Sequence, residues 1–364
     1  MKYSISILGT RGIPANHGGF ETFAEYLALY LLDKGWDVTV YCQVEGNENI
    51  SIDCWKGIKR INVPVNKNGA LGTILFDLKS TIHASRTNSL ILTLGYNTAL
   101  FSLIYRISRN RNIINMDGIE WKREKWSFIE KTWLYLNERI ACLVANHLIA
   151  DHPEIKNHLS TRVSREKISI IPYGAEEVAS GSFDVLTKYN LVSNEYAIVI
   201  ARPEPENSIL EIVTAFSKRP RGKKLVVLGK YDNSNYCKCV LEAANNEIIF
   251  PGAIYDKEIV QALRFHSALY IHGHQVGGTN PSLVEALGAG CAVLAHDNKF
   301  NRWVAGDKSS FFRTIKDCDV KLSNLLNNSR HLNDMKTSSL EVYRERFIWN
   351  NILQEYNDLL LAYR

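Results

Sequence analysis

The sequence predicts an α/β protein of the two-domain kind, with two Rossmann-like, doubly wound parallel sheets that face a central cleft. Three observations favour this class. Apolar runs of roughly four to eight residues alternate with longer amphipathic segments along almost the whole chain. The length of 364 residues is typical of about two domains. The alternation is interrupted once, between Pro172 and Glu195, where Gly, Ser and acidic residues replace the apolar runs.

The first half of the chain supplies the elements of the first predicted domain. Its apolar runs have the composition of strands that are buried on both faces, and they are Ser4–Leu8, Val38–Cys42, Ile58–Val63, Leu90–Leu94, Ile113–Asn115, Leu143–Ala150 and Ile168–Ile171. Helical spacing is clearest at Glu21–Lys34 and Phe128–Ile140. We expect this first domain to cover residues 1–175.

The second half repeats the alternation and predicts a second Rossmann-like domain over residues 176–345. Its strand candidates are Ala197–Ile200, Leu225–Leu228, Ile248–Phe250, Leu269–Ile271 and Ala292–Ala295, and its clearest helices are Ser208–Ser217, Asp256–Phe265 and Pro281–Leu287. Apolar residues recur at helical spacing near the end of the chain. We expect residues 346–364 to form a terminal helix.

Composition excludes several classes of protein. The hydrophobic fraction of 46% and the charged fraction of 22% are ordinary globular values. A net charge of +5 is too small to indicate a nucleic-acid partner. The seven cysteines include no C-x-x-C pair, as expected of free thiols in a reducing compartment. The N-terminal segment has the pattern of a β-strand rather than of a secretory signal. Polar residues interrupt the most apolar stretch, 90–107, which a membrane-spanning helix would not tolerate. We therefore expect a cytoplasmic protein without a transmembrane helix.

Two glycine-containing loops are candidate binding elements. Residues 9–20, GTRGIPANHGGF, lie between the first strand and its helix, where a turn that needs glycine is about as probable as a phosphate or sugar site. In residues 270–297, Thr279 or Asn280 can cap a helix that Pro281 opens. We expect backbone N–H groups of Gly278, Thr279 and Ser282 to face an anionic ligand, and Glu285 to accept hydrogen bonds from ribose hydroxyls.

These segments together resemble retaining nucleotide-sugar glycosyltransferases of family 4, which have the GT-B fold. GTRGIPANHGGFET, NMDGIEWKREKW and HGHQVGGTNPSLVEA are similar to the rhamnosyltransferase-like branch that builds bacterial surface polysaccharides. The resemblance implies a metal-independent hexosyltransferase without a cofactor, whose co-substrate is a dTDP- or UDP-sugar. It also implies that residues 1–175 bind the acceptor and residues 176–345 the nucleotide sugar, and that the terminal helix 346–364 crosses back to the first domain. With the loop residues above, it implies donor-binding roles for Gly12, Gly18, Gly19, Arg202, Asn207, His274, Gly277, Gly278, Thr279, Asn280, Ser282 and Glu285.

The chain departs from the family pattern at three positions. The family has two glutamates separated by seven residues, and here Gly277 stands at the first position and Glu285 at the second. The Arg and Lys that hold the donor diphosphate correspond to Arg202 and Asn207, so the lysine is missing. An acidic residue of the branch is replaced by Trp303.

The segment NMDGIEWKREKW supplies the candidate transfer residues. Asp117 follows a strand and precedes the flexible Gly118, so it is expected to lie in the interdomain cleft and to accept the acceptor's proton or hold a donor hydroxyl. Glu120 is the second catalytic candidate. A turn-forming aspartate is the alternative interpretation. Basic and aromatic side chains nearby suit an anionic membrane surface and a polyprenyl-diphosphate acceptor, and they are Trp121, Lys122, Arg123 and Trp126. A solvated helix face is the alternative for this cluster.

No metal site is expected. Asp317-Cys318-Asp319 spells D-x-D, the metal-binding signature of another glycosyltransferase fold, but it is interpreted as a surface turn before a helix at Val320–Leu326. His272 and His274 are two residues apart and would diverge on a strand.

The sequence thus predicts transfer of a hexosyl group, L-rhamnosyl from dTDP-L-rhamnose, to a lipid-linked or oligosaccharide acceptor. The expected setting is O-antigen, capsule or exopolysaccharide synthesis at the inner face of the cytoplasmic membrane. A nucleotide-sugar epimerase of the same fold and a degenerate nucleotide-sugar-binding subunit are the alternatives. The missing G-x-G-x-x-G fingerprint disfavours a dehydrogenase.

Overall fold

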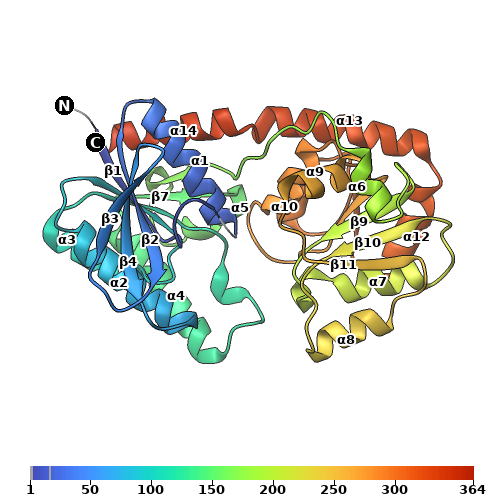
Figure 1. The fold of residues 1–364 in the computed structure, drawn as a ribbon, viewed down its shortest axis with the longest axis horizontal. Helices are drawn as coiled ribbons and strands as arrows, with labels where there is room; N and C mark the ends of the chain where they lie inside the picture. The colour runs from blue at the N-terminus through green and yellow to red at the C-terminus, as the bar shows by residue number, and fades with distance from the viewer. Residues whose placement is uncertain (1–2, 16–17) are drawn as a thin grey trace. The chain divides into compact units, whose positions relative to one another are not determined.

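A computed structural model describes residues 3–15 and 18–364, and it confirms the predicted class of two parallel-sheet α/β units (Figure 1). Unit 1 consists of Met1–Pro172 together with Asn350–Arg364, and unit 2 of Tyr173–Trp349. The boundaries expected from the sequence, after residues 175 and 345, lie within a few residues of these. Asn16 and His17 of the first glycine loop lie outside the described residues.

The sheet of unit 1 has eight strands in the order β3-β4-β2-β1-β5-β6-β7-β8. Its strands are β1 (Ser4–Leu8), β2 (Asp37–Glu45), β3 (Ser51–Trp55), β4 (Ile58–Val65), β5 (Leu90–Leu94), β6 (Asn112–Asn115), β7 (His147–Ala150) and β8 (Ile168–Ile170). All neighbours pair in parallel except β3 with β4, which are antiparallel. The sequence did not predict β3, because this edge strand is almost wholly exposed and lacks an apolar run.

Helices cover both faces of this sheet, with α1 and α14 on one face and α2, α3 and α4 on the other (Figure 1). The helices of unit 1 are α1 (Gly19–Asp33), α2 (Gly69–Ala84), α3 (Leu103–Ser108), α4 (Phe128–Val144), α5 (Pro153–Leu159) and α14 (Trp349–Ala362). Helix α14 is held against the unit by Tyr356, whose hydroxyl accepts a hydrogen bond of 2.7 Å from Asn115 and whose ring contacts Phe23. Asn357 accepts a 3.0 Å bond from Trp36.

Helix α4 is longer than the sequence predicted, and the strand after it is correspondingly shorter. The expected strand Leu143–Ala150 begins only at His147, since residues up to Val144 continue the helix. The helix starts with a capping box, in which the Ser127 side chain accepts from the N–H of Glu130 and the Glu130 carboxylate accepts from the N–H of Ser127.

The sheet of unit 2 has six parallel strands in the order β11-β10-β9-β12-β13-β14. They are β9 (Tyr196–Ile200), β10 (Lys224–Leu228), β11 (Ile248–Gly252), β12 (Leu269–His272), β13 (Val293–His296) and β14 (Ser310–Phe312), and the helices are α6 (Phe183–Lys188), α7 (Ile209–Ser217), α8 (Asn235–Glu242), α9 (Lys257–Phe265), α10 (Pro281–Gly288), α11 (Lys299–Ala305), α12 (Ile315–Leu326) and α13 (Ser329–Arg346).

Alternate residues of the central strand β9 enter two separate hydrophobic cores. Ala197 and Val199 pack in the core that includes α7 and α12, whereas Tyr196 and Ile198 pack in the core that includes α10 and α13. This alternation explains why the strands of unit 2 read as unbroken apolar runs, since both faces of the sheet are covered.

The D-x-D segment differs from its expected surface turn. Helix α12 already begins at Ile315, because Thr314 caps it by accepting the N–H of Asp317. Asp319 is buried within this helix and paired with Arg219 and Arg221.

Candidate donor and transfer sites

The candidate binding edge of unit 2 lies where the strand order reverses. β10 and β11 lie on one side of β9, and β12 to β14 lie on the other. The loops that follow β9 and β12 are joined by Gln275, whose N–H donates to the Glu206 carbonyl and whose side chain donates to Ser208, both at 2.9 Å. Doubly wound sheets bind their ligands at this kind of switch point, outside the carboxyl ends of the strands.

Helix α10 begins at this edge with Asn280 as its cap. The Asn280 side chain accepts the N–H of Ser282 at 3.0 Å, and Pro281 fills the first helical position. We expected the Ser282 N–H to face a ligand, but the cap already uses it. The Ser282 hydroxyl is also engaged within the unit, 2.6 Å from the Tyr270 hydroxyl and 3.2 Å from the Ile200 carbonyl. Ser282 therefore anchors α10 on the sheet.

Glu285 lies one turn into α10 and forms an ion pair of 2.6 Å with Arg264 of α9. The Arg264 side chain is 5% exposed and the Glu285 side chain 39% exposed. Burial lowers the pKa of Arg264, but the neighbouring charge of Glu285 outweighs it and the pKa stays above its ordinary value. The contact uses Oε2 of Glu285, and Oε1 makes no hydrogen bond with the part of the chain that the structure describes. The buried arginine thus fixes an accessible carboxylate that can accept hydroxyl hydrogen bonds.

The remaining predicted donor residues of unit 2 lie in the two joined loops. Arg202 is exposed just after β9, and its carbonyl accepts a 2.9 Å bond from the buried Asn207 side chain. Asn207 therefore braces the loop, in a position where the resemblance implies a phosphate-binding lysine. Gly277 has φ +145°, and a Cβ atom there would meet no described atom within 4 Å, so a glutamate would be strained by the backbone rather than by its neighbours. Thr279 is buried, and Gly278 lies beside it at the start of α10.

His274 stacks on His272, with ring centroids 4.3 Å apart and an interplanar angle of 9°. The two rings do not diverge as expected, because His272 ends β12 and His274 already belongs to the loop. Burial, reinforced by the nearby His274 and His296, lowers the pKa of His272 well below its usual value. His272 is therefore neutral at physiological pH. Among residues 3–15 and 18–364, no group of three or more His, Cys, Asp or Glu side chains could hold a metal ion.

The first glycine loop in unit 1 has a structural role at Gly12. Its φ is +123°, and a Cβ atom there would lie 2.7 Å from the Cys42 side chain of β2. This close approach requires glycine. Gly18 is the cap of α1 without a side-chain hydrogen bond, and Gly19 is the first residue of that helix. A Cβ atom at Gly18 would lie 2.5 Å from a carboxylate oxygen of Glu21, so a negative charge lies beside the start of α1, where the resemblance implies a donor phosphate.

Asp117 lies two residues past β6, in the left-handed region with φ +52°. Its N–H donates to the Asn115 side chain at 3.0 Å, which fixes the turn. Burial raises the pKa of Asp117 to about 6, and the negative charge of Glu120 adds to this effect. A carboxyl group whose pKa lies near neutrality can exchange a proton under physiological conditions.

The residues after Asp117 are held in place by unit 1 itself. The Glu120 N–H donates to the Tyr96 hydroxyl at 2.8 Å, and the Glu120 carboxylate pairs with Arg123 at 3.1 Å. Trp121 donates through Nε1 to Glu138 of α4 at 3.0 Å. Trp121 and Arg123, expected on a partner-binding surface, are thus partly committed within the unit. Lys122 is exposed, and Trp126 is half-buried.

Comparison with solved structures identifies the architecture. The chain is similar to sucrose-phosphate synthase from Thermosynechococcus elongatus, with a TM-score of 0.80 and 17% identity, covering 99% of this chain and 100% of that one. It is also similar to HepE from Anabaena in complex with UDP and glucose, with a TM-score of 0.79, 14% identity and coverage of 99% and 100%. A trehalose-phosphate synthase from Burkholderia xenovorans in complex with glucose-6-phosphate matches with a TM-score of 0.72 at 10% identity, with the same coverage.

Comparison with family models separates the two halves of the chain. Residues 2–176 match a domain of unknown function (DUF1972), and residues 188–339 match the glycosyl transferases group 1 model. Residues 188–339 therefore form a glycosyl transferase group 1 domain, and the chain as a whole has the GT-B fold. The glycosyl transferase match contains both joined loops, α9 and α10. No curated protein matches this chain.

The structure adds residues that the sequence did not single out. Arg264 lies in the amphipathic helix α9, and its sequence pattern does not show that the side chain is buried. Its role in holding Glu285 is visible only from their contact in the structure. Tyr270 lies inside an apolar strand, and its hydroxyl contact with Ser282 is likewise invisible in the sequence. In the sequence, the signal for Arg264 was its place beside the apolar residues Ala262 and Leu263 of α9, which suggests a buried charge that needs a partner.

Proposed function

We propose that this enzyme transfers a hexosyl group, L-rhamnosyl from dTDP-L-rhamnose, from a nucleotide-diphospho-sugar to a lipid-linked or oligosaccharide acceptor. The reaction would serve bacterial surface polysaccharide synthesis and proceed with retention, without metal or cofactor. The observation that carries the proposal is the switch point of unit 2, where the joined loops and α10 lie inside the glycosyl transferase match. The choice of rhamnose rests on the resemblance of the three sequence motifs.

Three kinds of protein group are proposed to bind the nucleotide sugar: a carboxylate, an arginine side chain and backbone N–H groups. Glu285, fixed by Arg264, accepts hydrogen bonds from the ribose. Arg202, together with loop N–H groups at Gly278 and Thr279, neutralises the diphosphate. HepE was solved with UDP, with UDP and glucose and with UDP-glucose, which supports a nucleoside diphosphate sugar as the donor class.

Calorimetric titration of the full chain with dTDP, UDP, dTDP-L-rhamnose and UDP-glucose tests the donor site. We expect dTDP-L-rhamnose to bind tightest. Glu285→Ala is expected to weaken nucleotide binding by about 1–3 kcal/mol, because a carboxylate that accepts ribose hydrogen bonds is lost. Affinity is the appropriate readout, since the variant also leaves Arg264 buried without its partner and lowers stability.

Glu258→Ala is the matched control, because Glu258 is an exposed glutamate of α9 and lies outside the proposed site. Its affinity should equal that of the parent. Unchanged nucleotide affinity in Glu285→Ala would remove Glu285 from the donor site, and absence of binding by every nucleotide would overturn the proposed function.

We also propose that unit 1 binds the inner membrane surface peripherally. The described residues form no helix that is long and apolar enough to cross a membrane. Helix α4 nevertheless exposes apolar side chains on one stripe, with Phe128 85%, Ile129 79% and Leu143 70% exposed. Arg106 of α3 donates to the Leu143 carbonyl at 3.2 Å, so a basic side chain lies directly beside the stripe.

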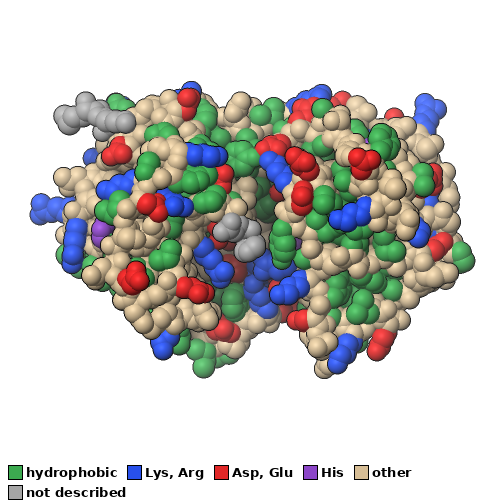
Figure 2. Space-filling model, in the orientation of Figure 1, with side chains coloured by type: hydrophobic (Ala, Val, Ile, Leu, Met, Phe, Trp, Pro, Cys, Tyr) green, Lys and Arg blue, Asp and Glu red, His purple; other side chains and the backbone are tan. Residues whose placement is uncertain are grey.

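The surroundings of this stripe favour an anionic bilayer over a neutral apolar partner. Ile107 of α3 is 84% exposed, and the basic residues Arg109 and Arg139 are exposed on α3's end and on α4. Figure 2 shows hydrophobic side chains at the lower end of unit 1, with both basic and acidic side chains near them. Each basic residue near an anionic surface contributes about 1 kcal/mol to the free energy of membrane binding. Exposed apolar side chains strengthen the binding further by inserting among the lipid headgroups.

Vesicle flotation tests the membrane proposal. The enzyme is expected to float with vesicles that contain phosphatidylglycerol at low salt, and to be released at high ionic strength because screening weakens the attraction. A Phe128→Ser, Ile129→Ser double variant should lose most of the binding. Phe183→Ser, at an exposed phenylalanine of unit 2, is the control and should float like the parent. Equal flotation with phosphatidylcholine alone, or none with either vesicle, would contradict the proposal.

A further inference from the structure

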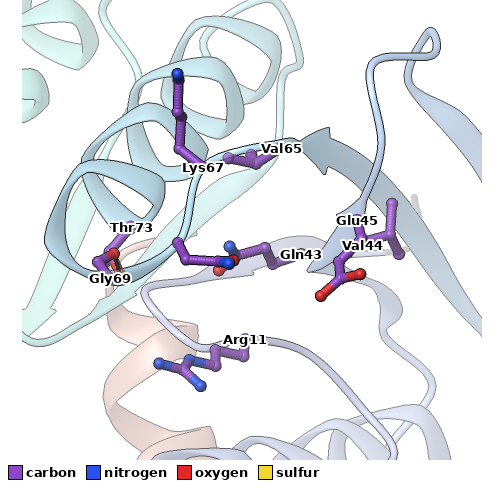
Figure 3. Close-up of a pocket in the computed structure, with 9 residues that line it drawn as sticks. Arg11, Gln43, Val44, Glu45, Val65, Lys67, Gly69 and Thr73 are labelled. Atoms are coloured by element: carbon purple, nitrogen blue, oxygen red, sulfur yellow. Dashed lines mark hydrogen bonds between the residues drawn. The ribbon is translucent and has the colours of Figure 1, made fainter.

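Unit 1 contains a pocket at the carboxyl edge of its sheet that none of the roles above uses. Its volume is about 250 Å³, and it is lined by Arg11, Gln43, Val44, Glu45, Val65, Lys67, Asn68, Gly69 and Thr73 (Figure 3). These residues come from the loop after β1, the ends of β2 and β4, and the first turn of α2. Because β1, β2 and β4 are parallel neighbours, their carboxyl ends meet at one edge, where this architecture places ligands.

The polar groups of the pocket are arranged around Gln43. Figure 3 shows the Arg11 guanidinium extending toward the side on which α2 begins, while Glu45 lies on the opposite side of Gln43. The Arg11 carbonyl accepts the N–H of Gln43 at 2.9 Å, which fixes the loop against β2. The Lys67 ammonium points away from Arg11 (Figure 3). One side of the pocket is therefore cationic and the other carries a carboxylate.

These polar side chains are not used to hold the fold together. Within the described part of the chain, the side chains of Arg11, Gln43, Glu45 and Asn68 form no hydrogen bond or ion pair. Asn68 stands at the cap position of α2, but its side chain makes no capping bond, so the first N–H groups of the helix stay available. The polar groups of these four side chains are therefore available to a ligand that enters the cavity.

We propose that this pocket binds an anionic sugar residue of the acceptor. The anion, a phosphate or a carboxylate, lies between the Arg11 guanidinium and the start of α2, where charge-assisted hydrogen bonds and the positive end of the helix dipole act together. The sugar hydroxyls are held by the Gln43 and Asn68 amides and by Glu45, which can only accept. A cavity of about 250 Å³ that is lined mainly by polar residues fits one sugar ring rather than a lipid chain.

This inference rests on the proposed function, because only a transfer reaction would make the bound sugar an acceptor. Binding at this pocket involves residues of unit 1 alone and does not depend on the donor site of unit 2. It also differs from the surface around Trp121 to which the sequence assigned the acceptor. A phosphorylated sugar and a uronic acid present the same chemistry to Arg11, so the experiment uses both as probes.

Ligand-observed NMR titration of the full chain with glucose 6-phosphate, glucuronate and glucose is the test. We expect at least one of the two anionic sugars to bind, and neutral glucose to bind about 10-fold or more weakly, as expected when a charge-assisted hydrogen bond is missing. Arg11→Gln should weaken the anionic sugar by about the same factor and leave glucose unchanged. Glu45→Gln should weaken all sugars that bind.

Arg86→Gln is the matched control, because Arg86 is an exposed arginine just beyond the opposite end of α2. It should bind the anionic sugar like the parent. UDP and dTDP titrations of Arg11→Gln separate the two proposals, since nucleotide affinity should be unaffected. Selective binding of glucose 6-phosphate identifies a phosphorylated acceptor, and selective binding of glucuronate identifies a uronic acid. Failure of both anionic sugars to bind, or parent-like binding by Arg11→Gln, would overturn the inference whether or not nucleotides bind.

Discussion

Replacing Asp117 by asparagine is expected to lower the rate of sugar transfer by about 10²–10⁴-fold, the usual contribution of a general base. The physical reason is its environment. Burial and the nearby charge of Glu120 raise the pKa of Asp117 to about 6, so the carboxylate is basic enough to take a proton from an acceptor hydroxyl. Asparagine has nearly the same shape but cannot accept a proton.

Asparagine is also the substitution that best preserves the backbone at this position. Residue 117 has φ +52°, a left-handed conformation that asparagine and aspartate adopt more readily than other residues with side chains. The hydrogen bond from the N–H of residue 117 to Asn115 does not involve the substituted side chain. Circular dichroism and nucleotide affinity should therefore match the parent, and Asp33→Asn, at an exposed aspartate of α1, is the control for a simple loss of charge.

The pH dependence gives an independent readout of the same group. Asp117 acts as a base only when ionised, so the transfer rate of the parent should fall as the pH drops through about 6. The variant should lack this limb of the pH profile. A fall in kcat with unchanged donor KM indicates proton transfer, whereas a raised donor KM indicates that Asp117 positions the sugar instead. Transfer at the parent rate would exclude Asp117 and direct attention to Glu120.

Much of the fold could be predicted from the sequence because buried parallel strands are nearly continuous apolar runs. The elements it missed are those for which this signal is absent. Strand β3 is an exposed antiparallel edge, and β14 has only three residues. Helix α2 was not singled out, and it carries glycines at residues 69 and 72, which lower helix propensity.

The candidate sites were predictable where local chain geometry determines them and less so where tertiary contacts do. The capped start of α10 follows from the order of Asn280 and Pro281, and the position of Asp117 follows from a strand end before glycine. The pairing of Glu285 with Arg264 joins residues of two helices, and no spacing in the sequence encodes it. The pocket beside Arg11 likewise assembles three separate strand ends.

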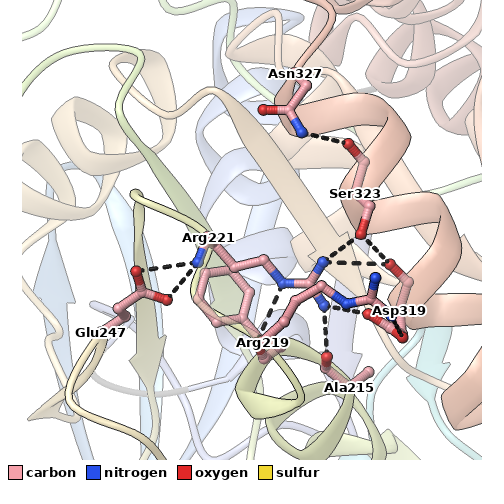
Figure 4. Close-up of polar contacts among 8 residues, drawn as sticks. Ala215, Arg219, Arg221, Glu247, Asp319, Ser323 and Asn327 are labelled. Carbon is pink, nitrogen blue, oxygen red and sulfur yellow. Dashed lines mark hydrogen bonds and ion pairs between the residues drawn. The ribbon is translucent and has the colours of Figure 1, made fainter.

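Asp319 of the D-x-D segment has a structural role that only its tertiary contacts show. Its carboxylate is 5% exposed and accepts from Arg221 at 2.5 Å and from Arg219 at 2.6 Å (Figure 4). Arg221 is itself 3% exposed and donates to the Ala215 and Phe216 carbonyls at the end of α7 and to Ser323 of α12. The arginine therefore joins the C-terminal end of α7 to α12, and Asp319 neutralises its buried charge.

Asp319→Asn is expected to destabilise unit 2 by about 3–5 kcal/mol, the usual cost of leaving one partner of a buried ion pair without its counter-charge. Urea unfolding measures the loss, and hydrogen exchange should localise it to α7 and α12. Burial raises the pKa of Asp319, but hydrogen bonds from Arg221 and Arg219 outweigh it and hold the pKa below its ordinary value. The pair therefore contributes its full stability at pH 7 and loses it as the pH falls below about 4.

The D-x-D motif supplies its own matched control for this prediction. Asp317 lies two residues earlier on α12, is only half-buried and accepts the N–H of Arg313 at 3.1 Å. Asp317→Asn should cost about 1 kcal/mol or less, since one hydrogen bond to a partly exposed group is affected. If both variants lost the same small amount of stability, the Arg221–Asp319 pair would not hold α7 to α12. A large loss at Asp319 alone would establish that this aspartate serves folding, because both of its oxygens are already occupied by arginines.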